Sequence, residues 1–347
     1  MEDFHNSEKM INLMKKQAET RKLVKWGSSK TLIMSLPRSW TKKYNLTEDN
    51  EVQVCENPDG SLLVLPLQFN REESVMEAEI KVDQYPNREM LAHLIQTKFL
   101  DGNDKIHLTS KNAFTEADFK EISEVASSLT GFEILTKAPL EIMMKDMWAL
   151  KESSLDELVK FLSFKVLELL GNFIKALTPL NFSTLETINT TKNDVFRYYL
   201  RVHRQLRKAL IQPSLLTKMN ITTQDAMDFA FFIVNLNDVA TNIASMSNAV
   251  LKYHPKQIVE RTLEILNPVS QKLNSAVSAF CFKNTKDALM VLSQVEELKA
   301  RKRDIENDID KETAEEAHIE SQIILDNSEK IIDFIFSIAL AALRRAV

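Results

Sequence analysis

Four polar side chains recur every three or four residues in an otherwise apolar stretch, residues 222 to 252, and this spacing places them on one face of a predicted helix. They are Asn235, Asp238, Asn242 and Ser245. Most of the remaining circumference is apolar, which is typical of a helix buried in a bundle; the side chains concerned are Phe229, Phe231, Phe232, Ile233, Val234, Leu236, Val239 and Ile243. Because a buried, unpaired carboxylate is costly, we expect Asp238 to meet a cation, a basic side chain, a hydrogen-bonding network or an open groove. The alternative is a satisfied polar core or a solvent-exposed edge.

The same pattern returns near the C-terminus, where Asp326, Glu329, Asp333 and Ser337 again share one predicted helical face. The two stretches align as DVATNIA, from Asp238, and DFIFSIA, from Asp333. Two polar-striped helices, one near the end of each half of a helical region, indicate a duplicated bundle.

Two segments, NDVFRYYLRVHRQLRKAL and VNLNDVATNIASM, resemble the PhoU family of phosphate-uptake regulators, most closely its archaeal members. The resemblance implies two three-helix repeats, each with an ExxxD motif followed by an NIA-like sequence, whose carboxylates bind metal ions on the bundle surface. By position, the first motif falls on Val234 and Asp238, and the second on Glu329 and Asp333. Valine cannot ligate a metal, so the first motif lacks its glutamate, whereas the second has both family residues.

The metal ligands that this resemblance implies are therefore Asp238, Glu329 and Asp333, for a divalent or trivalent ion, with Fe, Zn, Mg and Ca not distinguished by the sequence. The run RKRDIENDIDKETAEE precedes the second motif and reads most simply as a solvated helix face with opposite charges four residues apart. Alternatively, since several carboxylates assemble around hard cations, this run supplies three candidate extra ligands: Glu306, Asp308 and Asp310.

A second concentration of charge lies near the N-terminus, between Met14 and Lys43. Nine basic residues stand there against one acidic residue, Glu19, giving a net charge of +8 within a chain whose formal charge is -5. A basic field of this size attracts polyanions, of which nucleic acid is the usual one. The alternative is a solvated, lysine-rich start.

Around these charges we expect a short strand ending at Gly27, a second strand stopped by Pro37, one amphipathic helix, and a hairpin that turns at PDG. Within residues 21 to 67, three pieces resemble the AbrB-like (SpoVT/AbrB) swapped-hairpin domains: WGSSKTLIMSLPRSW, NLTEDNEV and GSLLVLPL. The resemblance implies a DNA-binding homodimer formed by strand exchange, since each chain supplies only part of the sheet.

The basic side chains that this resemblance brings to the DNA phosphates are Lys22, Lys25, Lys30 and Arg38, with Arg21 in support. Lysine positions a protein on DNA by charge, whereas bidentate arginine reads guanine edges. Because lysine predominates, base-specific readout is not expected from this set. The domain could instead serve mainly as a dimerisation clasp.

Glycine divides the chain, because four glycines lie within the first 131 residues and only Gly171 follows. Since glycine favours turns and is costly inside helices, we predict an α+β N-terminal part, consisting of an AbrB-like swapped-hairpin β domain and a small α/β domain. An all-α, PhoU-like bundle of two three-helix repeats follows. The predicted parts are an N-terminal extension (1–20), the AbrB-like domain (21–67), a small α/β linker domain (76–147) and the six-helix bundle (152–347), with repeats at about 152–252 and 256–347.

Within residues 76 to 147 we expect strands at MEAEIKVD, DKIHLTS, FEILTKA and LEIMMKD. Two helices should alternate with them, one ended by Gly102 and one capped by Thr115 and ended by Gly131. In the bundle, Pro179, Pro213, Pro255 and Pro268 are expected between helices or near a helix start.

Composition narrows the functional class. With 44% apolar and 27% charged residues the chain is globular, and its two distant cysteines, Cys55 and Cys281, fit a reduced cytosolic setting. The polar, acidic N-terminus is unlike a secretory signal, and the longest apolar run, 331–343, is shorter than the roughly 20 residues that span a bilayer. We therefore expect a cytoplasmic protein without membrane insertion. The six histidines are scattered, and no phosphate loop, metalloprotease pair or nucleophile elbow occurs, so we do not expect an enzyme.

These features together predict a DNA-binding transcription regulator of phosphate uptake whose bundle senses metal or phosphate status, or a partner protein. The alternative is a PhoU-type adaptor that contacts a phosphate transporter, a sensor kinase or another regulator, with the AbrB-like domain only a dimer clasp.

Overall fold

The computed structural model describes residues 19–28, 30–56, 60–67, 75–85, 88–148, 154–253, 260–312 and 318–346. The chain divides into two compact units, Met1–Ser74 and Val75–Val347. Each unit is described by itself.

The N-terminal unit consists of two hairpins and one short helix. Its elements are β1 (Val24–Lys25), β2 (Leu32–Ile33), α2 (Arg38–Lys43), β3 (Val52–Glu56) and β4 (Leu62–Pro66). β1 pairs antiparallel with β2, and β3 with β4, as two separate two-stranded sheets. The predicted order of strand, strand, helix and hairpin is confirmed, although β1 and β2 are only two residues each. The predicted PDG turn lies partly outside the described residues, but its Gly60 has the positive φ, 79°, that a tight turn requires.

The second unit begins with a four-stranded sheet and two helices. They are β5 (Glu77–Lys81), a 3-10 turn (Val82–Gln84), α3 (Arg88–Leu100), β6 (Lys105–Thr109), α4 (Glu116–Ser128), β7 (Phe132–Ala138) and β8 (Glu141–Asp146). The strand order is β5-β6-β8-β7, in which β5 and β6 are parallel and the other pairs antiparallel. Thr115 caps α4, as predicted, and it also forms a capping box with Asp118.

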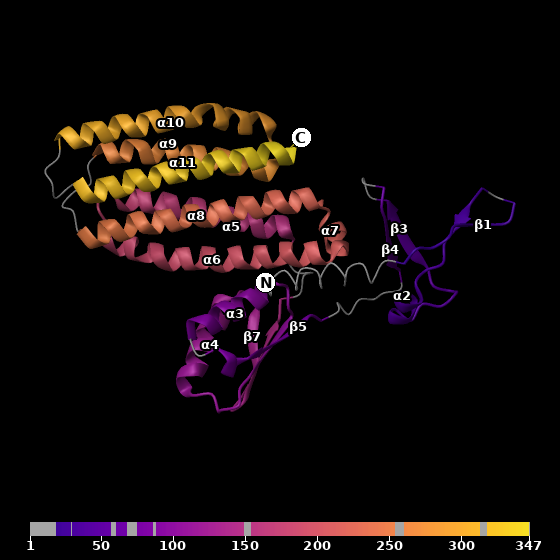
Figure 1. Cartoon of the computed structure of the whole chain (residues 1–347). Coiled ribbons are helices and arrows are strands. Elements are labelled where there is room, and N and C mark those ends of the chain that lie inside the picture. The colour runs from indigo at the N-terminus through magenta and orange to yellow at the C-terminus, as the bar shows by residue number, and fades with distance from the viewer. Residues whose placement is uncertain are drawn as a thin grey trace, which may run out of the picture. The chain divides into compact units, whose positions relative to one another are not determined.

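The rest of the second unit is a helical bundle (Figure 1). Its helices are α5 (Leu155–Ala176), α6 (Phe182–Ile211), α7 (Pro213–Met219), α8 (Thr223–Tyr253), α9 (Glu260–Phe282), α10 (Thr285–Glu312) and α11 (His318–Ala346). The six predicted long helices are confirmed. The short helix α7 was not predicted; it begins at Pro213, whose fixed φ suits a first helical position.

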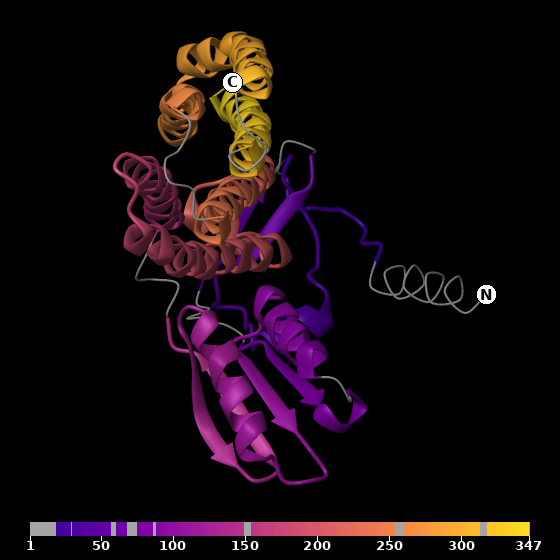
Figure 2. The same ribbon diagram turned by 90° about the vertical axis from the view of Figure 1, so that its left-hand side faces the viewer.

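Viewed nearly along the helix axes, α9, α10 and α11 form one group and α5, α6 and α8 another (Figure 2). The two groups share one continuous apolar core. Within it, Phe280 of α9 stacks on Phe232 of α8 with ring centroids 3.8 Å apart, and Phe229 meets the same ring edge-on at 5.5 Å. The two groups of helices therefore bury their apolar faces against each other.

One expectation about proline is wrong, because Pro268 lies inside α9 rather than between helices or near a helix start. An interior proline removes a backbone donor and costs about 3 kcal/mol. Ile265, Leu266, Val269 and Leu273 are nevertheless completely buried around it. Burial of each such side chain contributes about 1.5–3 kcal/mol, so tertiary packing outweighs the local cost.

None of the described helices is long and apolar enough to cross a bilayer.

Candidate functional site

The predicted DNA-binding side chains gather around the first hairpin. Lys25 lies in β1, Lys22 precedes it, and Lys30 lies in the turn, which is closed by a hydrogen bond from the Trp26 amide to the Thr31 carbonyl (2.9 Å). All three lysines are exposed, as is Arg38 at the first position of α2.

Arg21 differs from these residues, because its guanidinium is paired with the carboxylate of Glu19. That pair uses the one acidic residue of the basic segment to neutralise one of the two arginines in the predicted set. The free positive charge of this surface therefore comes mainly from lysine, which fits phosphate contact better than base readout.

Apolar side chains of the same unit are exposed as well. Trp26 is 64% exposed, Leu23 61% and Leu32 57%, and no described residue between 19 and 67 is buried. The other large apolar side chains exposed there are Val24, Ile33, Met34, Val54, Leu62 and Leu67. Because none of its described side chains is buried, this unit lacks a core that would hold it together alone. Large exposed apolar surfaces mark interaction sites, so this surface is a candidate for one.

At the second motif, each carboxylate of α11 meets a lysine of α10. Lys302 Nζ lies 3.1 Å from Glu329 Oε2, and Lys299 Nζ lies 2.6 Å from Asp333 Oδ1. Since the two helices run antiparallel, a step of three residues on α10 matches a step of four on α11. The hydrogen bond to Asp333 raises the pKa of Lys299. Burial lowers the pKa of Lys302, but its bonds to Glu306 and Glu329 outweigh this and raise it overall, so both side chains stay cationic.

Lys302 also contacts two further carboxylates. Its Nζ lies 2.9 Å from Glu306 Oε2 and 3.9 Å from Asp326 Oδ1. Of the candidate extra ligands, Glu306 is therefore engaged by a lysine, Asp308 also has an interaction partner, and the side chain of Asp310 lies outside the description.

The residues at this motif do not fit a resident metal ion. Glu329 and Asp333 each already hold an ammonium group. Across the described residues, no group of three or more His, Cys, Asp or Glu side chains is arranged to hold a metal. Hard cations such as Mg²⁺ and Ca²⁺ take six or more oxygen ligands, whereas the carboxylates of this cluster are already engaged by Lys299 and Lys302.

The first motif presents Asp238 at a partly buried edge of α8. Burial raises the pKa of Asp238, and a hydrogen bond with Asn237 only partly offsets this. Burial and the charge of Asp238 also raise the pKa of Tyr199 on α6. Val234, where the predicted motif would have a glutamate, is a partly exposed apolar side chain.

The polar stripe around Asp238 is satisfied by its own helix. Asn235 Nδ2 donates to the Phe231 carbonyl, and Asn242 Nδ2 donates to the Asp238 carbonyl, both at 2.7 Å. The stripe lies at the edge of the buried face, which agrees with the alternative prediction of a solvent-exposed edge. The prediction that Phe231 belongs to the apolar cover is wrong, since it is 55% exposed.

A cluster of ion pairs between α6 and the α/β domain was not predicted at all. Arg201 Nη1 and Arg204 Nη2 lie 2.8 and 3.0 Å from Asp146 Oδ2 at the end of β8. Arg204 Nη2 and Lys208 Nζ lie 3.0 and 2.6 Å from Asp104 Oδ1. The three cations are almost completely buried, and we call this cluster the α6 junction.

Backbone carbonyls complete the α6 junction. Arg204 Nη1 donates to the carbonyl of Phe99 at 2.6 Å, and Arg201 Nη2 to that of Trp148 at 2.8 Å. Gly102 allows the close approach of α6, because a Cβ there would lie 3.1 Å from the Cβ of Lys208. The signal in the sequence was the spacing of Arg201, Arg204 and Lys208, which puts three cations on one face of a helix with many apolar residues.

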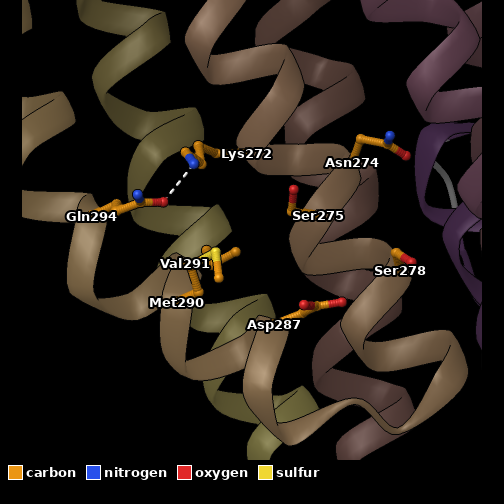
Figure 3. Close-up of a pocket in the computed structure, with 8 residues that line it drawn as sticks. All are labelled: Lys272, Asn274, Ser275, Ser278, Asp287, Met290, Val291 and Gln294. Atoms are coloured by element: carbon orange, nitrogen blue, oxygen red, sulfur yellow. Dashed lines mark hydrogen bonds between the residues drawn. The ribbon is translucent and has the colours of Figure 1, made fainter.

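A polar pocket of about 230 Å³ lies between α9 and α10 (Figure 3). Lys272 Nζ donates to Gln294 Oε1 across it, and Asp287 and two serines of α9 also line it. The pocket contains none of the residues that the sequence singled out, and its one lysine and one aspartate balance in charge.

Comparison with solved structures gives a likeness over part of the chain. No family model matches the chain, and no curated protein matches it. The chain is similar to the solved structure of the phosphate transport system regulatory protein PhoU from Streptococcus pneumoniae, with 16% sequence identity and a TM-score of 0.47. The match covers 55% of this chain and 91% of that one.

Proposed function

We propose that this protein is a DNA-binding regulator of phosphate uptake. Its N-terminal unit forms a homodimer that contacts the phosphates of DNA, and its helical bundle is the module that receives the signal. The observation that carries the proposal is the coincidence, in residues 19–67, of a basic hairpin and an apolar surface that this chain leaves uncovered.

The uncovered apolar surface supports a dimer. β1–β2 and β3–β4 are each only two-stranded, and an isolated two-stranded hairpin is marginally stable in water. A second copy offers the same strands and the same apolar side chains, so pairing the two copies would supply both the missing strands and the missing core. Strand exchange between AbrB-like domains is one arrangement that meets this need.

The placement of charge supports DNA as the ligand. Lys22, Lys25 and Lys30 lie on or beside the hairpin β1–β2, and Arg38 begins the helix that follows. A dimer would present each of these side chains twice. Because most of these side chains are lysines, we expect them to bind the phosphate backbone of DNA, with an affinity that depends strongly on the salt concentration.

The link to phosphate rests on the resemblance of the segments that begin at Asn193 and Val234 to the PhoU family. Three inputs are compatible with that resemblance: a metal ion, phosphate itself or a partner protein. The lysines at the second motif argue against the metal ion, since they already bond Glu329 and Asp333.

DNA binding by the full-length protein at 50 and 200 mM salt tests the proposal. With four basic side chains per chain and two chains, affinity should fall by roughly 10³–10⁵ between these concentrations. Lys25→Glu with Lys30→Glu should weaken binding and flatten the dependence on salt by roughly one unit of slope per lost phosphate contact.

The matched control is Lys120→Glu with Lys218→Glu, which changes the net charge equally at exposed sites of the second unit. This control should bind DNA like the native protein. Equal loss in both variants would mean that total charge, rather than the hairpin, governs binding. Genomic fragments retained by the native protein should include DNA upstream of phosphate-transport genes, and their absence would remove the phosphate part of the proposal.

The second candidate is a protein adaptor in which the N-terminal unit only joins two copies. The observation that favours it is a set of exposed apolar side chains on the two motif helices: Met227, Phe231 and Val234 of α8, and Phe336 of α11. Absence of DNA binding at low salt from a protein that is still dimeric would select this candidate.

A further inference from the structure

The second motif contains two positive charges that belong to the protein itself. Lys302 is 3% exposed, although a buried lysine is rare unless it is paired. Its ammonium group is surrounded by the carboxylates of Glu306, Asp326 and Glu329. One turn along α10, Lys299 holds Asp333.

These contacts satisfy both carboxylates of the ExxxD pair from one neighbouring helix. Glu329 and Asp333 each bond a different lysine, so both residues tie α11 to α10. Lysine donates in three directions from a compact charge, which lets the Lys302 ammonium group meet several carboxylates at once, as a bound cation does.

We propose that Lys299 and Lys302 are the built-in cations of the second motif. Lys302 neutralises Glu329 and Lys299 neutralises Asp333, as a metal ion would do, and the motif joins two helices of the bundle rather than binding metal. This inference concerns the bundle alone, and it holds whether or not the N-terminal unit binds DNA.

The charges of the cluster show what removal of the lysines would leave. Four carboxylates, those of Glu306, Asp326, Glu329 and Asp333, share the two ammonium groups. Without the lysines, four negative charges would remain on adjacent turns of α10 and α11, and Glu329 and Asp333 are half exposed. Released from the lysines, these carboxylates would be free to turn toward a hard divalent ion such as Mn²⁺, for which carboxylate oxygens are suitable ligands.

Mn²⁺ binding, measured by calorimetry on the full-length protein, tests the inference in two ways. First, the native protein and a Glu329→Gln, Asp333→Asn variant should bind the same number of Mn²⁺ ions with the same affinity. A native site that disappears in this variant would overturn the proposal, and that comparison does not depend on the folding of any lysine variant.

Second, Lys299→Gln with Lys302→Met should gain one Mn²⁺ site, at least tenfold tighter than any in the native protein. Adding Glu329→Gln should remove it. The matched control is Lys165→Met, which removes a lysine that lies 3.0 Å from Glu168 on α5. This control should gain no site, because only a single carboxylate is freed. A folded double lysine variant that binds no additional Mn²⁺ would overturn the claim that the lysines take the place of a metal.

Discussion

At the scale of single residues, Asp146 shows how one carboxylate joins two parts of the second unit. Its Oδ2 receives hydrogen bonds from Arg201 and Arg204, while its Oδ1 accepts from the Trp148 amide. Both guanidinium groups also donate to backbone carbonyls. If the carboxylate were lost, two buried positive charges would depend on Asp104 and these carbonyls alone.

We therefore expect Asp146→Asn to lower the free energy of unfolding by about 3–5 kcal/mol, the cost of breaking a buried ion pair from one side. Urea denaturation of the full-length protein measures it. The control is Asp101→Asn, which breaks the exposed pair with Arg207 (2.7 Å) and should cost less than about 1 kcal/mol. Equal costs for the two variants would contradict the view that burial makes the Asp146 pairs important.

His203 gives the structure a dependence on pH. Burial, and then the nearby charge of Arg207, lower the pKa of His203 below its usual 6.5. Its Nδ1 is buried without a hydrogen-bond partner among the described residues, and its ring lies 5.5 Å from that of Tyr199. The folded protein thus favours the neutral imidazole.

The sign of the pH effect follows from this preference. The contribution of His203 is fully present above pH 6.5, the unfolded pKa, and is lost as the pH falls from there toward the lower folded pKa. We expect His203→Gln to reduce the loss of stability between pH 7 and pH 5, measured by urea midpoints at each pH. An unchanged slope would mean that His203 is readily protonated in the folded protein.

At the scale of elements, α9 is the helix whose sequence most opposes its structure. Pro268 leaves the carbonyl of Glu264, four residues earlier, without its helical donor. Pro268→Ala would restore that donor and remove the clash of the proline ring. It would also raise the conformational entropy of the unfolded chain, which lowers the free energy of unfolding by about 0.4–1 kcal/mol.

Because the helical gain is about 3 kcal/mol, we expect Pro268→Ala to raise the free energy of unfolding by roughly 2 kcal/mol. Thermal and urea unfolding measure it. Pro213→Ala is the control, since Pro213 stands at the first position of α7, where its missing donor costs nothing. A lower midpoint for Pro268→Ala would mean that the proline ring makes packing contacts of its own.

Most elements could be predicted because their signals are local. The helical periods of α5, α6, α8 and α11 and the cap Thr115 are each contained within a few turns of sequence. Pro268 misled the prediction because packing against the core decides that position, and no local pattern records it.

The partners of charged residues could not be predicted, because they depend on the register between helices. Glu329 and Asp333 were singled out, but nothing in their own stretch shows that Lys302 and Lys299 lie opposite them. Likewise, Arg204 meets the carbonyl of Phe99, which is 105 residues away in the chain. Residue types along one helix can suggest that a cation is needed, and only the packed structure identifies it.

At the scale of the whole molecule, the role of the uncovered apolar surface of the N-terminal unit can be tested by measuring the oligomeric state. Trp26→Asp with Leu32→Asp places two charges on the surface that this chain leaves uncovered. We expect the native protein to sediment as a dimer and this variant as a monomer in analytical ultracentrifugation, because burial of unpaired charge at the proposed interface is unfavourable.

The control for this prediction is Phe164→Asp, which changes a similarly exposed aromatic residue (59% exposed) on α5 of the bundle. It should leave the dimer intact. If the Trp26 and Leu32 variant remained dimeric and the Phe164 variant did not, the contact between copies would lie on the bundle.

The α6 junction also limits where the chain can be truncated without unfolding the bundle. Leu200 packs into the core of the α/β domain, and Tyr199 touches both that core and the core of the bundle. A fragment that started at α5 would expose Arg201, Arg204 and Lys208, which are buried in the intact protein, and would lack the aspartates that neutralise them. The segment between β8 and α5 therefore does not separate two parts that fold independently. A fragment made to keep the bundle folded needs to begin before β5.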